Sequence, residues 1–184
     1  MKTTSRLALS LLCALFSIVC AASVRADAPA TFKVGSFTFT RPATWEWVEV
    51  TSAMRKAQLR VTDAGSKASA EAIFYYFGQG DGGGTKANVD RWLGQFQEPR
   101  DKINAKVEEV TVGKTKITYV QAEGTYSSGM PGGPTTPMAD YALLGAILES
   151  DQGNVFVRMT GPKALVKSSV ADFKKLIESG PVRN

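Results

Sequence analysis

The chain has 184 residues, a formal net charge of +5, no histidine and two cysteines. This length suits a single domain whose core can be stable without a disulfide or a structural metal. The lack of histidine excludes the usual zinc sites built on imidazole, the Ser-His-Asp triad and the Cys-His pair.

The first residues predict a secretory signal peptide over 1–26. Lys2 and Arg6 precede an apolar stretch at 7–22, which is too short and too abruptly ended to cross a bilayer comfortably. Small residues, Ala26 among them, stand where a signal peptidase requires them. We therefore expect a periplasmic or secreted protein without a stable membrane anchor; a retained anchor is the weaker alternative.

Cleavage near Ala26 would leave one domain at 27–184. Cys13 and Cys20 both lie in the leader, so the mature chain has neither a thiol nor a disulfide. Three basic residues and no acidic residue leave with the leader, which lowers the net charge to about +2. Because no basic run follows, we expect no nucleic-acid partner.

The first part of the mature chain predicts short strands. A Gly-Ser pair divides alternating phenylalanines at 32–39, which is a hairpin pattern. Further strands are predicted at 45–50, 57–62 and 70–77. Residues 73–77 are apolar on both faces of the strand, so this strand should lie inside the sheet with both faces covered.

A glycine-rich loop at 78–84 leads into the first predicted helix, at 86–97. Thr85 is the expected N-cap residue. Apolar residues recur at helical spacing and predict one buried face: Val89, Trp92, Leu93 and Phe96.

The second half of the chain predicts another hairpin and two more strands. The hairpin comprises 106–112 and 115–125, and a loop rich in glycine and proline follows at 127–137. Strands are then predicted at 141–149 and 155–160, the first of them again apolar on both faces.

The last predicted element is one helix that starts at Pro162 and ends before Gly180. Hairpin connections predict an antiparallel sheet, and two double-faced strands with two amphipathic helices predict helices on both faces of it. The sequence therefore predicts an α+β fold, an antiparallel β-sheet flanked by helices in an α/β/α sandwich. A sheet with both helices on one face is the alternative.

Several segments resemble a family of uncharacterised exported bacterial proteins. They cover nearly the whole mature chain: 54–58, the glycine loop from Phe77, Asn88, Arg91, Trp92, Gln95, Phe96, 141–147 and 159–162. The order of elements is also similar to the Mog1/PsbP-like fold. PsbP assists the photosynthetic oxygen-evolving complex and Mog1 binds a small GTPase, so this resemblance implies an accessory or binding role rather than catalysis. It transfers neither partner, because no functional motif is matched.

The glycine loop and the helix after it form the first candidate site. A purely structural turn is the favoured interpretation of the loop; the alternative is an anion site, since exposed backbone amides beside a helix N-terminus can hold an anion. The phosphate-loop pattern is absent, because Gly84 is followed by Thr85 and then Lys86. The candidate ligand- or partner-binding residues are Gly80, Gly82, Gly83, Thr85, Asn88, Arg91, Gln95 and, in the 127–137 loop, Met130.

Two functions follow from these features. The first is a non-catalytic binding or accessory protein that holds an envelope protein partner on a surface shared by the 78–84 loop, the helix after it and the 127–137 loop. The alternative is a small-ligand carrier with a pocket between sheet and helices, lined by Trp45, Trp47, Tyr76 and Trp92.

Catalysis ranks below both functions, because the remaining options need a Ser-Lys pair or a carboxylate dyad and no recurring spacing points to one. We expect no cofactor and no metal. The scattered methionines Met54, Met130, Met138 and Met159 form no compact copper motif.

Overall fold

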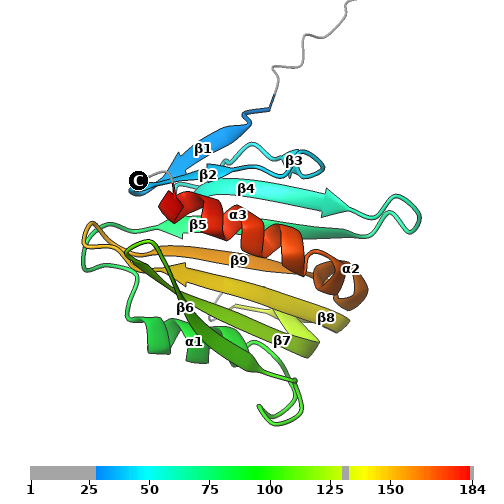
Figure 1. Ribbon diagram of the computed structural model, residues 1–184. Helices are drawn as coiled ribbons and strands as arrows, with labels where there is room; N and C mark the ends of the chain where they lie inside the picture. Colours follow the sequence, from blue (N-terminus) through cyan, green and yellow to red (C-terminus); the bar gives the residue numbers. More distant parts are fainter. Residues whose placement is uncertain (1–27, 130–132, 183–184) are drawn as a thin grey trace, which may run out of the picture.

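The computed structural model describes residues 28–129 and 133–182. The predicted signal peptide and Met130 lie outside the described residues. Seven strands form one antiparallel sheet (Figure 1). In spatial order they are β3 (Glu46–Trp47), β4 (Arg55–Thr62), β5 (Ser69–Tyr76), β9 (Val155–Pro162), β8 (Thr135–Leu148), β7 (Thr115–Gly129) and β6 (Lys106–Val112). The predicted α+β class with an antiparallel sheet agrees with this arrangement.

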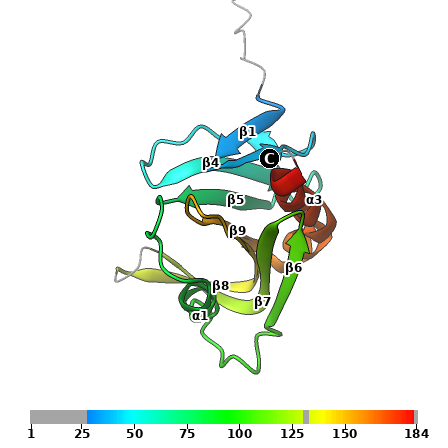
Figure 2. The ribbon, with the colours of Figure 1, turned by 60° about the vertical axis from the view of Figure 1, so that its left-hand side comes forward.

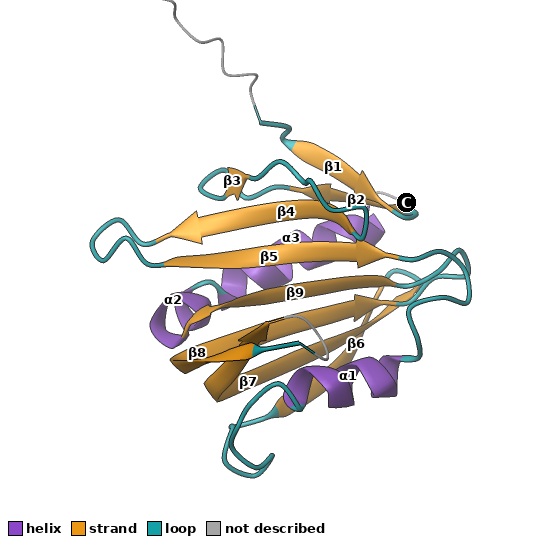
Figure 3. Cartoon of the chain, turned by 180° about the vertical axis from the view of Figure 1, so that it is seen from behind, coloured by secondary structure: helices purple, strands orange, loops and turns teal. Residues whose placement is uncertain are grey.

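The remaining elements pack against the two faces of the sheet. The hairpin of β1 (Thr31–Val34) and β2 (Phe37–Thr40) shares one face with α2 (Lys163–Ser168) and α3 (Val170–Val182). The other face carries α1 (Thr85–Leu93). Figures 2 and 3 show α1 and α3 on opposite sides of the sheet.

The central strands supply residues to both faces, since successive side chains of a strand point in opposite directions. In β8, Leu144 and Leu148 join the cluster under the hairpin and α3, the hairpin-side cluster, whereas Leu143 and Ile147 join the cluster under α1, the α1-side cluster. The prediction that the two double-faced strands lie inside the sheet is confirmed by their places as β5 and β8.

The start of α1 differs from the prediction. Gly84, not Thr85, is the N-cap residue, and no side chain caps the helix there. The hydroxyl of Thr85 donates instead to Glu149, 2.9 Å away at the end of β8. Because the Glu149 carboxylate is within hydrogen-bond distance, the Thr85 hydroxyl bonds to it and not to a backbone amide of α1.

The single C-terminal helix that the periodicity predicts is divided in two. Ser169 stands between α2 and α3, and its hydroxyl donates to the carbonyl of Leu165 at 2.8 Å. The backbone N–H of Ser169 donates to the carbonyls of Leu165 and Val166 as well, and a serine hydroxyl that bonds one turn back often bends a helix. α3 then continues beyond the predicted end, with Gly180 packed against Phe39 of the hairpin.

Other expectations on element bounds are wrong too, and the helix predicted to reach 97 ends at Leu93. The predicted strand at 45–50 shortens to β3, Glu46–Trp47, and of the described residues 48–50 only Val48 still donates a backbone hydrogen bond to β4, to the carbonyl of Gln58 at 3.0 Å. The predicted loop at 127–137 is partly strand, since β7 continues to Gly129 and β8 begins at Thr135.

Both ends of the described chain are tied to the β1–β2 hairpin. The Arg41 guanidinium, just after β2, donates to the carbonyls of Pro29 and Trp45. The amide of Thr40 donates to the Ser179 hydroxyl near the end of α3, at 2.8 Å. Across 28–129 and 133–182, no helix combines the length and apolar character needed to cross a membrane.

Candidate functional site

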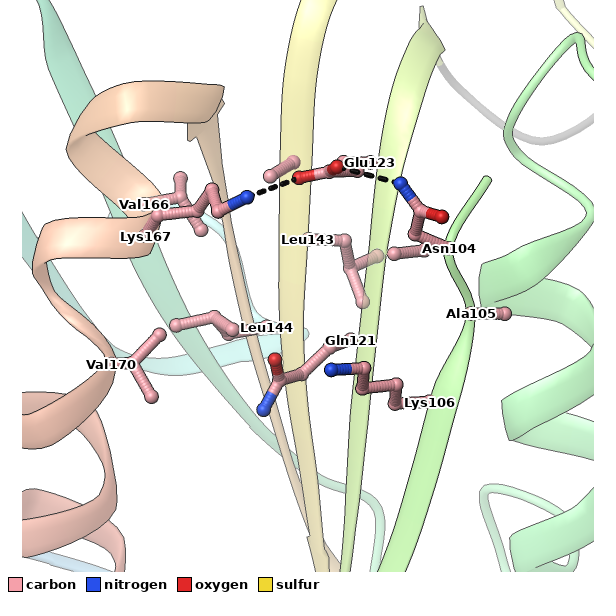
Figure 4. Close-up of a pocket in the computed structure, with 12 residues that line it drawn as sticks. Asn104, Ala105, Lys106, Gln121, Glu123, Leu143, Leu144, Val166, Lys167 and Val170 are labelled. Carbon is pink, nitrogen blue, oxygen red and sulfur yellow. Dashed lines mark hydrogen bonds and ion pairs between the residues drawn. The ribbon is translucent and has the colours of Figure 1, made fainter. Parts of the chain in front are cut away.

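A pocket of about 430 Å³ opens between the last two helices and one corner of the sheet (Figure 4). We call it the α2 pocket. Its volume falls in the range of roughly 300–1,000 Å³ that is usual for small-molecule sites. It is lined by Asn104, Ala105, Lys106, Gln121, Ala122, Glu123, Ala142, Leu143, Leu144, Val166, Lys167 and Val170.

One wall of the pocket is a row of side chains across three neighbouring strands. Lys106 of β6 pairs with Gln121 of β7, and Gln121 pairs with Leu144 of β8. Directly opposed residues of an antiparallel sheet point to the same face, so these three side chains lie next to one another on the face that carries α2 and α3.

The helices supply an apolar wall opposite this row. Val166 of α2 is buried, and Val170 at the start of α3 is partly buried; both pack with Leu144 and Ala142 in the hairpin-side cluster. The chain turns at Ser169, so each of the two helices contributes a valine to the pocket. Figure 4 shows Lys106 and Gln121 pointing toward Leu144 and Val170.

The rim carries a carboxylate whose charge is already matched. Glu123 accepts a hydrogen bond from the Asn104 amide at 2.8 Å and forms an ion pair with Lys167 at 3.1 Å. The Asn104 amide and then the Lys167 ammonium hold the pKa of Glu123 below its ordinary value. Glu123 is therefore a fixed anion at neutral pH.

The wall also holds polar groups that the rest of the protein leaves unused. Within the ranges that the structure describes, the ammonium of Lys106 has no ion pair or hydrogen bond, and neither has the side-chain amide of Gln121. Lys106 is exposed and Gln121 half-buried. Lys167 already forms an ion pair with Glu123, whereas the positive charge of Lys106 is available to a ligand.

The residues predicted from the glycine loop mostly bond to one another. Asn88 is buried, and its amide donates to the carbonyls of Gly82 at 2.8 Å and Gly84 at 3.0 Å. Arg91 in turn donates to the side-chain oxygen of Asn88. Gly83 lies beside the Asn88 amide in a left-handed conformation, φ +79°, that favours glycine. Asn88 thus closes the loop onto the first turn of α1.

The other predicted site residues are spread along α1 and its neighbours. Gln95 accepts a hydrogen bond from Arg158 of β9 at 2.7 Å, Thr85 bonds to Glu149, and Gly80 is exposed with nothing near its Cα hydrogens. Anion or partner binding at these positions stays a prediction.

The two predicted binding loops do not meet. The 78–84 loop contacts Gly153 in the turn after β8, whereas the described parts of the other segment, 127–129 and 133–137, lie at the end of β7 and the beginning of β8. Because β8 extends over 14 residues, the two loops lie at opposite ends of the sheet. The shared surface expected from the sequence is therefore not formed by these loops directly, although α1 runs between them.

The aromatic lining predicted for a ligand pocket is also wrong. Trp45 is 1% exposed in the hairpin-side cluster, and Trp92 is 4% exposed in the α1-side cluster. Trp47 and Tyr76 pack partly buried against the hairpin-side cluster, and none of the four lines the α2 pocket. These large rings fill the space between the layers.

The pocket residues themselves were missed, yet the sequence contains an indication of them. Ile117 and Tyr119 point toward the helices, and Gln121 and Glu123 continue the same alternation. Polar residues that interrupt an inward-facing row indicate that the core is open at that point.

The described residues hold no group of three or more Asp, Glu, His or Cys side chains that could bind a metal ion. No family model and no curated protein matches this chain. Among solved structures, the chain is similar to the solution structure of cyanobacterial PsbP (CyanoP) from Synechocystis sp. PCC 6803, with 10% identity and a TM-score of 0.49. The match covers 87% of this chain and 97% of that one. It assigns no ligand or partner here.

Proposed function

We propose that this chain is a non-catalytic binding protein that holds a small ligand in the α2 pocket. The observation that carries the proposal is the pairing of an apolar wall with polar groups that lack partners in the described chain: Leu144 and Val170 face Lys106 and Gln121. Ligand sites typically combine a mostly apolar surface with a few polar groups that fix orientation.

The chemistry of the rim favours binding over catalysis. A general acid or base works best when its pKa lies near the operating pH. Asn104 and Lys167 instead lower the pKa of Glu123, which moves it further from neutral pH. Export to the periplasm or secretion is part of the proposal, and the predicted signal peptide supports it.

The experiment fills the pocket and measures binding of the fluorescent probe 1-anilinonaphthalene-8-sulfonate. Val170→Trp should place an indole in the pocket and abolish most of the fluorescence enhancement of the wild-type protein. Val182→Trp is the matched control, because Val182 lies in the same helix and is 74% exposed. Circular dichroism checks that both variants fold. Equal probe binding by Val170→Trp and wild type would refute the pocket as the site.

A second candidate function is contact with a protein partner beside the glycine loop. Phe77 favours it: this ring is 40% exposed, stacks with Tyr75 at a centroid distance of 6.3 Å and borders Gly82. Exposed aromatic rings are common anchors of protein interfaces. Capture of envelope proteins by the tagged mature protein should then depend on Phe77, and Phe77→Ser should release the same partner that wild type retains.

A further inference from the structure

We infer that the α2 pocket takes a small amphipathic carboxylate, whose acidic group binds Lys106 and Gln121 and whose aliphatic part lies on Leu144, Val166 and Val170. This inference rests on the proposed function and names the ligand class of the same pocket.

The charge of the wall selects an anion. Lys106 and Gln121 are direct cross-strand partners, so an ammonium and an amide N–H can donate to the same carboxylate. Hydrogen bonds from a charged donor to a carboxylate are among the stronger ones in proteins. A cationic ligand would face repulsion from Lys106, and the carboxylate of the pocket lining, Glu123, is already bound by Lys167 at 3.1 Å.

The register of the sheet sets the distance between the acidic group of the ligand and its aliphatic part. Leu144 is the cross-strand partner of Gln121, so apolar surface begins one interstrand spacing, ~4.8 Å, from the acidic group. Val166 and Val170 close the apolar side from the helices. A short aliphatic acid therefore matches both walls, whereas an inorganic anion would use only the polar one.

Titration calorimetry with four probes tests the inference: hexanoate, 1-hexanol, hexylamine and inorganic phosphate. We expect hexanoate to bind at least tenfold more tightly than each of the others. Lys106→Met should weaken hexanoate to the level of 1-hexanol and leave 1-hexanol unchanged. Lys114→Met is the matched control, since Lys114 is an exposed lysine in the β6–β7 turn, and it should bind hexanoate as wild type does.

The outcomes separate this inference from the proposed function. Equal binding of hexanoate and 1-hexanol, both lost in Val170→Trp, would refute the role of Lys106 and keep the pocket. Hexanoate binding that survives Val170→Trp would refute the pocket itself. Phosphate binding as tight as that of hexanoate, or no hexanoate binding at all, would overturn the ligand class.

Discussion

Gly145 is where the α1-side cluster comes closest to the sheet backbone. A Cβ atom at this position would lie 2.4 Å from Cζ3 of Trp92, so the indole occupies the space that any other side chain would need. We expect Gly145→Ala to lower the free energy of unfolding by about 1–3 kcal/mol, as for other overpacked cores. Urea denaturation measures this change.

Gly65 offers the matched control. An added Cβ there would meet its nearest neighbour, an Asp63 carboxylate oxygen, at an ordinary 3.5 Å, so Gly65→Ala should change stability by no more than about 0.5 kcal/mol. Gly145→Ala combined with Trp92→Leu should cost less than the sum of the two single changes, because the smaller side chain frees the space. Strict additivity would show that the contact is not the cause.

Individual residues were predictable where a repeating pattern fixed their direction. Val89, Trp92, Leu93 and Phe96 were predicted as one buried face, and all four are buried. The fit of Trp92 against Gly145 could not be predicted, since it depends on a contact between segments more than 50 positions apart.

The strand β6 forms one edge of the sheet and needs protection against pairing with another chain. On the face turned away from α3 it carries Val107, Glu109 and Thr111, and Val107 is 47% exposed. Glu109 stands next to Val107 on the same face and pairs with Lys116 at 3.1 Å. Charged side chains on edge strands are a common device against aggregation.

Replacing this charge should expose an apolar edge. We expect Glu109→Val to cause concentration-dependent self-association in analytical ultracentrifugation, because it joins Val107 in an apolar pair on an open strand. Glu109→Gln is the control: it also loses the Lys116 ion pair but stays polar, and should sediment as wild type does. If Glu109→Val also sediments as wild type, the charge has no protective role.

At the level of helices and strands, periodicity predicted type and order better than bounds. Val166, Val170 and Phe173 keep one apolar face across the break between α2 and α3, so nothing in the hydrophobic pattern reveals it. The break falls at Ser169, whose hydroxyl and backbone N–H both donate to the carbonyl of Leu165. It is this turn that brings the start of α3 to the pocket.

In the whole molecule, the hairpin-side cluster and the α1-side cluster lie on opposite faces of the same sheet. Since β8 and β9 supply residues to both clusters, neither can lose its packing without disturbing the other. We therefore expect one cooperative unfolding transition. Tryptophan fluorescence can test this, because Trp45 and Trp47 report on the hairpin-side cluster and Trp92 on the α1-side cluster.

Two unfolding midpoints are compared for the same variant, so a difference in stability between variants does not affect the result. In Trp92→Phe, and separately in the double variant Trp45→Phe with Trp47→Phe, the fluorescence midpoint in urea should coincide with the midpoint from far-ultraviolet circular dichroism. A fluorescence midpoint that departs from circular dichroism in either protein would show that the clusters unfold independently.

The position of the pocket in the molecule was beyond the reach of local patterns. Lys106, Gln121 and Leu144 become neighbours only because β7 pairs with β6 on one side and with β8 on the other. The sequence predicted the strands, but not their spatial order, and the aromatic residues suggested a pocket in the wrong place because large rings are equally suited to a closed core.

The ties at Arg41 and Thr40 have a practical consequence for handling the protein. Val170 borders the pocket at one end of α3, and Val182 lies roughly 20 Å away at the other end, beside the hairpin that also holds the start of the described chain (Figure 1). Immobilisation on a sensor surface through the end of α3 would thus attach the molecule at a point remote from the pocket. Lys114, in the β6–β7 turn, lies beside Ser36 and Phe37 of the same hairpin, so coupling through its side chain would also attach the molecule away from the pocket.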